Sequence, residues 1–166
     1  MQSPTKRWVG VSGLTLLYPV VAYIVTYIPN PMVPGAIVAL NMIFPVLAGH
    51  FYGPISGAVA GCLGTALATL LSGSQFEAYS IFPHTLMGFT AGWIGQFRSE
   101  FASAATILIG HLLNILFYVR MGLMFVPAAQ LGVTLLGLIS EVMIDIVAIV
   151  LLIFLFKRWL YREERW

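Results

Sequence analysis

The stretch from Asn41 to Gly73 reads NMIFPVLAGHFYGPISGAVAGCLGTALATLLSG and contains no Asp, Glu, Lys or Arg. Four of its glycines are spaced four residues apart, namely Gly49, Gly53, Gly57 and Gly61. Residues four apart share one face of a helix, so this spacing predicts a strip of small residues that a second helix can approach closely. Close backbone approach and dispersion hold helices together in lipid. The stretch therefore predicts tightly packed membrane helices.

The composition of the whole chain also favours lipid as the solvent. Its 166 residues are 60% hydrophobic and only 8% charged, whereas about 25% of the residues of a soluble domain are charged. A soluble domain of this size has too much surface to hide so many apolar side chains. We expect residues 1–166 to form one all-α transmembrane domain, which leaves no room for a soluble catalytic domain or a nucleotide-binding cassette.

The apolar sequence divides into six segments, each close to the roughly 20 residues that a membrane span needs. Each break contains Gly, Pro or charged residues, where a helix should stop. The second segment is short, and the sixth is long enough to tilt or to extend beyond the membrane. The predicted six-transmembrane-helix bundle has spans at roughly 9–28, 35–49, 53–72, 81–97, 102–121 and 128–156.

The basic residues predict the orientation of the bundle, because Lys and Arg accumulate on the cytoplasmic side. With the N-terminus inside, seven of the eight Lys and Arg residues fall on the cytoplasmic side and Arg120 alone falls outside. We therefore expect both termini in the cytoplasm and a multi-pass protein of the cell membrane. No small-residue cleavage site follows the first apolar run, so we expect that run to be retained as a span. The basic residues sit at the ends of apolar runs and give no indication of nucleic-acid binding.

Polar side chains inside a membrane span are costly and therefore indicate function. On the fifth span His111, Asn114 and Tyr118 share one face, and on the sixth Gln130, Thr134, Glu141 and Asp145 form one stripe. If these faces converge, they enclose a pocket that opens outward, is floored by His111 and Glu141, and suits a flat heterocyclic ligand. The predicted substrate-binding residues are Glu77, Tyr79, His84, His111, Asn114, Tyr118, Arg120 and Glu141. The predicted helix-packing or partner-packing glycines are Gly49, Gly53, Gly57, Gly61, Gly88 and Gly92.

Several of these residues have a purely structural alternative. His111 and Glu141 would satisfy each other as a buried pair, and Asp145 would pair with Arg98 or face a partner subunit. Cys62 is either a small packing residue or a soft axial ligand for a cobalt-bearing corrinoid. The three histidines lack i, i+4 spacing with each other, so we expect no metal site, and nothing in the sequence indicates a resident cofactor.

The region from Met32 to Tyr118 resembles the substrate-binding (S) components of energy-coupling-factor (ECF) transporters. The resemblance rests on VPGAIVALNMIFPVLAG, on FYGPISGAVAG, on FPHTLMGFTAGWIG (82–95) and on ILIGHLLNILFY (107–118), in this order. It implies a six-helix protein that captures a vitamin or related micronutrient at an outward-facing pocket. It also implies delivery by toppling while docked to a transmembrane T subunit and two ATPases. The resemblance leaves the vitamin open.

Three alternatives to this function remain at this stage. The first span has no Ala-x-x-x-Ala patch, which many family members use to dock the T subunit, so the chain would also fit a solitary S-like transporter. A proton-coupled secondary transporter or channel would use Glu141 and Asp145, although no inverted repeat is visible. An intramembrane protease would use Ser12 of the GVSG motif with His111, but these residues are expected at different membrane depths, and a nucleophile and its base must lie within about 3 Å.

Overall fold

The computed structural model describes residues 4–30, 38–97 and 99–163, with side chains described as far as residue 158. The predicted all-α fold is confirmed. Part of the first predicted outer connection and the position of Arg98 lie outside the described residues. The helices are α1 (Pro4–Val25), η1 (Leu40–Met42), α2 (Ile43–Tyr52), α3 (Pro54–Ser72), α4 (Gln75–Gly95), α5 (Glu100–Ala105), α6 (Ile107–Arg120), η2 (Ala128–Gln130) and α7 (Leu131–Glu163).

These elements form the six predicted helical passes, since η1 continues into α2 and α5 continues into α6. Four segments of the described chain are long and apolar enough to cross a membrane, namely Pro4–Val25, Pro54–Ser72, Glu100–Arg120 and Ala128–Arg158. The second pass, Leu40–Tyr52, is apolar but shorter. A helix of 13 residues is only about 20 Å long, which is less than the hydrocarbon thickness of about 30 Å.

The start of α4 differs from the prediction. Residues 72–80 were expected to be an outer connection, but α4 begins at Gln75 rather than near residue 81. The Ser74 side chain accepts a hydrogen bond from the backbone N–H of Glu77 and so caps the helix. This cap satisfies an amide that would otherwise lack a partner at the helix start, and it places Glu77 inside the first turn.

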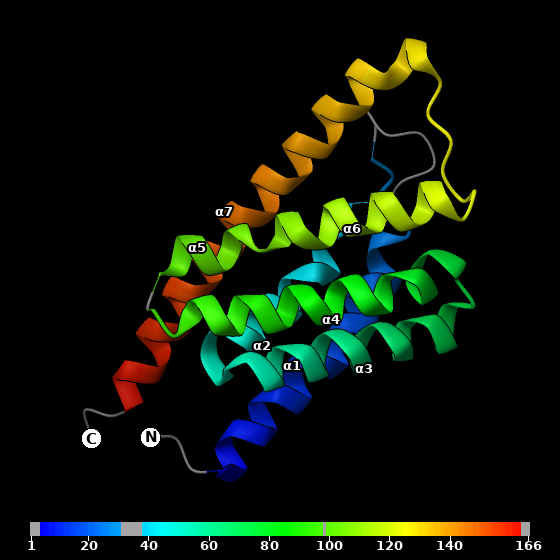
Figure 1. The fold of residues 1–166 in the computed structure, drawn as a ribbon. Helices are drawn as coiled ribbons and strands as arrows, with labels where there is room; N and C mark the ends of the chain where they lie inside the picture. Colours follow the sequence, from blue (N-terminus) through cyan, green and yellow to red (C-terminus); the bar gives the residue numbers. More distant parts are fainter. Residues whose placement is uncertain (1–3, 31–37, 98, 164–166) are drawn as a thin grey trace.

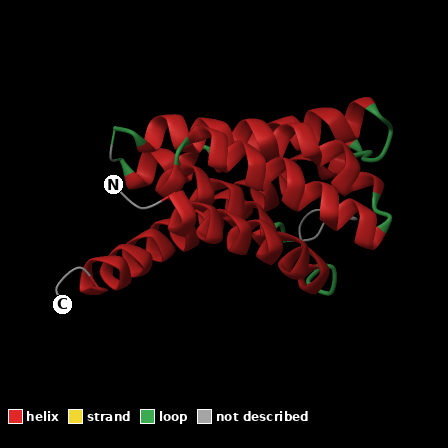
Figure 2. Ribbon diagram, turned by 90° about the horizontal axis from the view of Figure 1, so that it is seen from below, coloured by secondary structure: helices red, strands yellow, loops and turns green. Residues whose placement is uncertain are grey.

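Helices α3, α4, α5 and α6 run in nearly the same direction, α1 and α7 are inclined to them, and α1 begins at the same end of the molecule at which α7 ends (Figures 1 and 2). We call this the terminal end and the opposite one the loop end. At the terminal end Lys157 of α7 pairs with Glu100 of α5, and His50 of α2 bonds Ser103 at 2.9 Å. Toward the loop end α7 diverges from α6 (Figure 1). The bundle is therefore tied together most closely at its terminal end.

Glycines bring the backbones of α2, α3 and α4 into direct contact. A Cβ atom added to Gly49 or to Gly57 would clash with the carbonyl oxygen of Gly88, and one added to Gly88 would clash with the carbonyl of Gly57. One turn further along, Gly61 faces the His84 carbonyl in the same way. No side chain fits between these helices, so their attraction comes from close backbone contact.

Gly53 has a different role from its neighbours in the predicted strip. It ends α2 and precedes Pro54 of α3, so the strip is divided between two helices. Its φ of +91° lies in the region that favours glycine, and a Cβ there would meet nothing within 4 Å. Gly53 therefore forms a turn that lets Gly49 and Gly57 meet α4 from two separate helices, whereas the sequence spacing indicated one continuous face.

Replacing Gly88 by Ala is expected to destabilise the protein by at least about 2 kcal/mol, because a methyl group must displace the backbone of α3. The control is Gly13→Ala, since Gly13 lies within α1 and a Cβ there meets nothing within 4 Å. That change should be neutral or should stabilise by up to about 1 kcal/mol. Thermal unfolding in detergent measures both, and equal melting temperatures for the two variants would contradict the packing described here.

Candidate functional site

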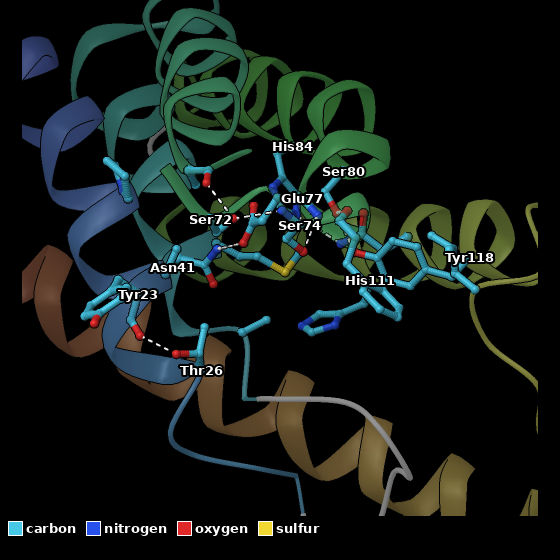
Figure 3. Close-up of a pocket in the computed structure, with 18 of the residues that line it drawn as sticks. Tyr23, Thr26, Asn41, Ser72, Ser74, Glu77, Ser80, His84, His111 and Tyr118 are labelled. Atoms are coloured by element: carbon cyan, nitrogen blue, oxygen red, sulfur yellow. Dashed lines mark hydrogen bonds between the residues drawn. The ribbon is translucent and has the colours of Figure 1, made fainter. Parts of the chain in front are cut away.

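A cavity of about 930 Å³ lies at the loop end of the bundle, with walls from α1, η1, α3, α4, α6 and α7. Most of the predicted substrate-binding residues line it (Figure 3). They come from three helices, α4, α6 and α7, which meet around this one cavity. The predicted residues in the lining are Glu77, His84, His111, Asn114, Tyr118 and Glu141.

One buried hydrogen-bond network is centred on His84 and Glu77 of α4. Tyr18 of α1 places its hydroxyl 2.7 Å from His84 Nδ1 and donates to Glu77 Oε2 at 3.1 Å. The Asn114 amide nitrogen lies 3.0 Å from His84 Nε2. On the other side the Asn41 amide nitrogen donates to Glu77 Oε1 at 3.3 Å. The network therefore joins α1, η1, α4 and α6 across the cavity wall.

The Asn114 amide nitrogen, which donates, and the Glu77 carboxyl group, which accepts, determine the direction of these hydrogen bonds. An amide nitrogen can only donate, so His84 Nε2 accepts from Asn114 and the ring proton of neutral His84 lies on Nδ1. That proton points to the Tyr18 hydroxyl and to Thr65 Oγ1, which is 3.0 Å away. Tyr18 in turn donates to the carboxyl group of Glu77. The hydrogen bonds through Tyr18 and Asn41 thus end at Glu77, and each amide nitrogen donates one hydrogen bond to this network.

A second polar group lies where α6 faces α7. His111 Nε2 is 3.0 Å from Asp145 Oδ2, and the Asp145 side chain is fully buried. Glu141 instead accepts from the backbone N–H of Ala39 at 2.7 Å and from the Asn30 side chain at 2.9 Å. Among the described residues, His111 therefore pairs with Asp145 and not with Glu141, as the alternative had it. The other expected partner of Asp145, Arg98, lies outside the described residues. Asp145 lies one turn further along the same stripe and reaches the imidazole.

His111, Glu141 and Asp145 also each place a metal-ligating atom within 4.8 Å of the others. The spacing of the histidines did not indicate this group, because it contains a single histidine and its three members come from two helices. Each member of this group already has a hydrogen bond within the protein. Glu141 accepts from Asn30 and Ala39, and His111 contacts Asp145. Among the described residues the Asp145 Oδ1 atom is left without a hydrogen-bond partner.

Two predicted residues lie away from the cavity lining. Tyr79 is exposed on α4, and Arg120 is exposed as the last residue of α6. Tyr118 does reach the cavity, where its hydroxyl bonds Ser80 and its ring meets Phe76 edge-on at 5.0 Å. Cys62 lies in α3 and is also absent from the lining.

Sequence reasoning missed several residues of the site. Tyr18 lies in an apolar run where a tyrosine gives no signal of its own, and Asn41 is a single amide at the start of an apolar stretch. Thr65 and Ser80 are small residues whose hydroxyls usually bond their own helix. Their importance follows from their position opposite the polar groups of α4 and α6, which only the tertiary fold establishes.

Replacing Asp145 by Leu is expected to destabilise the protein by about 3 kcal/mol, because His111 then keeps a buried imidazole without its partner. The double variant His111→Leu/Asp145→Leu should recover most of this loss. A double-mutant cycle of unfolding free energies measures the coupling, with Ser140→Ala as control, since Ser140 is exposed and bonds its own helix. If the losses of unfolding free energy in the two single variants add up in the double variant, His111 and Asp145 do not stabilise each other.

Comparison with known protein families agrees with the all-α membrane fold described above. The chain matches the family described as ECF-type riboflavin transporter, S component, over residues 6–161. No match was found among curated proteins, and none among solved structures. The family is one of transporter subunits that take up vitamins across a membrane together with a T subunit and ATPases. The matched region covers nearly the whole chain, and we conclude that this multi-pass membrane protein belongs to the S components of ECF-type riboflavin transporters.

Proposed function

We propose that the cavity at the loop end is where this chain binds a riboflavin-type vitamin before uptake. The class of ligand is inferred from the family to which the chain belongs, and the binding site is inferred from the cavity. Its volume of about 930 Å³ is within the range of sites for small molecules, which combine apolar walls with a few polar groups. The observation that carries the proposal is the convergence of Glu77, His84 and Asn114 on this one cavity.

The proposed orientation places the loop end outside the cell and both termini in the cytoplasm of a cell-membrane protein. The excess of Lys and Arg near the terminal end supports it. In this orientation the cavity faces the medium from which a nutrient is captured. The chain itself would then bind and carry the vitamin without catalysing a reaction.

The proposed partners are a T subunit and two ATPases, as in the family. ATP hydrolysis would take place in the ATPases, and this chain would supply the binding site. The alternative of a solitary or proton-coupled carrier differs in one measurable way, because it predicts accumulation of vitamin without ATP.

Replacing Asn114 by Leu is expected to weaken riboflavin binding by at least about 10-fold, because it removes a polar group from the cavity and breaks the bond to His84. Arg120→Gln is the control, since Arg120 lies outside the lining, and its affinity should stay within about 2-fold of the wild type. Quenching of flavin fluorescence by the purified protein measures both. Equal affinities of the two variants for riboflavin would show that Asn114 does not contribute to binding.

Proteoliposomes that contain this chain alone should bind riboflavin but not accumulate it. Adding the T subunit and ATPases with ATP should produce accumulation, because transport against a gradient needs the coupled energy source. The measurement is the uptake of radiolabelled riboflavin over time, with ADP in place of ATP as control. Accumulation by the chain alone under a pH gradient would favour the proton-coupled alternative instead.

A further inference from the structure

Tyr18 of α1 lies behind the wall of the cavity. It is 0% exposed and is not part of the lining. The two side chains that its hydroxyl bonds, those of Glu77 and His84, do belong to the lining (Figure 3). A ligand in the cavity would therefore meet Glu77 and His84 directly, and Tyr18 would act on that ligand through them.

The Tyr18 hydroxyl serves both lining residues at once. It donates to Glu77 Oε2 at 3.1 Å and accepts from His84 Nδ1 at 2.7 Å. The other side-chain donor to Glu77 within the described chain is Asn41, which bonds Oε1 at 3.3 Å. His84 Nδ1 has a second partner in Thr65 at 3.0 Å. Removing the hydroxyl would leave Glu77 Oε2 without its donor, whereas the imidazole would keep a partner at the same nitrogen. The Glu77 carboxyl group therefore depends on Tyr18 more than the imidazole does.

The position of Tyr18 is itself set by the contact between α1 and α3. A Cβ atom added to Gly64 of α3 would lie 2.9 Å from Tyr18 Cβ, 3.0 Å from its Cγ and 3.3 Å from the carbonyl oxygen of Thr15. The backbone of α3 thus packs directly against the base of the Tyr18 side chain, without room for a methyl group. Because Gly64 is also outside the lining, a shift of α1 against α3 would reach the cavity through the phenol.

We propose that Tyr18 is a positioning residue of the binding site and holds Glu77 and His84 in place from behind the cavity wall. Through Tyr18, the affinity of the cavity for its vitamin depends on how α1 packs on α3. A site keeps its affinity when the residues behind it hold the contacting side chains within about 0.5 Å of their working positions. This inference rests on the function proposed above and assigns to that function a residue outside the lining.

The first test is Tyr18→Phe, which removes the hydroxyl and keeps the ring. We expect riboflavin to bind at least about 5-fold more weakly, because Glu77 loses a hydrogen bond that orients it. The control is Tyr52→Phe, since Tyr52 ends α2 outside the lining, and its affinity should stay within about 2-fold of the wild type. Quenching of flavin fluorescence measures both. Wild-type affinity in Y18F overturns the inference while the proposed function stands.

A double-mutant cycle tests whether Tyr18 acts through Glu77. In the background of Glu77→Leu the hydroxyl has no carboxyl group to orient, so Y18F should weaken riboflavin binding by no more than about 2-fold there. A loss of affinity that is coupled to Glu77 in this way is not expected from a general loosening of the fold. The same fold-loss from Y18F in both backgrounds would show that Tyr18 does not position Glu77.

The dependence on helix packing is tested from α3. Gly64→Ala pushes on Tyr18 without changing a lining residue and should weaken riboflavin binding by at least about 3-fold. The control is Gly95→Ala, whose new Cβ would crowd the backbone of His50 at 3.2 Å, away from the cavity. G95A should lower the melting temperature and leave the affinity within about 2-fold. Wild-type affinity in G64A contradicts the dependence on packing, and Y18F remains decisive for the role of Tyr18 if G64A does not fold.

A wild-type protein that does not bind riboflavin overturns the proposed function for that vitamin. The positioning role is then decided without ligand, by nuclear magnetic resonance of protein labelled with ¹⁵N in its histidines. The His84 signals, assigned with a His84→Gln variant, should shift in Y18F and stay unchanged in Y52F, because a ring nitrogen reports the hydrogen bond that it makes. Unchanged His84 signals in Y18F overturn the inference.

Discussion

The direct contact between the backbones of α2, α3 and α4 is the constraint on which the rest of the structure depends. Gly49, Gly57 and Gly88 carry no side chain, so the carbonyl of one helix reaches the backbone of the next. Gly61 extends the contact to the His84 carbonyl. One turn beyond Gly61, Thr65 therefore reaches the imidazole of His84. The contact that packs the helices also positions the central ring of the polar network.

The polar network in turn explains why so many hydrogen-bonding groups are tolerated inside an apolar bundle. A buried polar group costs free energy unless it is partnered, and here each donor of the chain from Asn114 to Glu77 has an acceptor. Glu77 is the acceptor at which the bonds from Tyr18 and Asn41 end. The network therefore holds α1, η1, α4 and α6 together around the cavity through partnered polar groups.

Hydropathy and glycine spacing were sufficient to predict six helices and their close packing, and the polar residues within the spans predicted six residues of the cavity lining. The pattern Ser74-x-x-Glu77 is a capping-box sequence that would have located the start of α4. Other features depend on contacts distant in sequence. Glu141 and Asp145 share one stripe, so periodicity alone did not decide which of them reaches His111. The bonds of Glu141 to Asn30 and Ala39 span more than 100 residues and leave no local signature.

The short second pass has a consequence for the size of the cavity. Helix η1 and α2 together extend about 20 Å, so they leave roughly 10 Å of a 30 Å hydrocarbon layer unfilled. A missing helix segment of this length and about 10 Å in diameter has a volume of roughly 800 Å³, close to the 930 Å³ of the cavity. The cavity therefore has about the volume of the missing turns, and Asn41 of η1 is in its lining. A molecule bound in the cavity would touch several of these helices at once, and any molecule that binds only the folded state stabilises it.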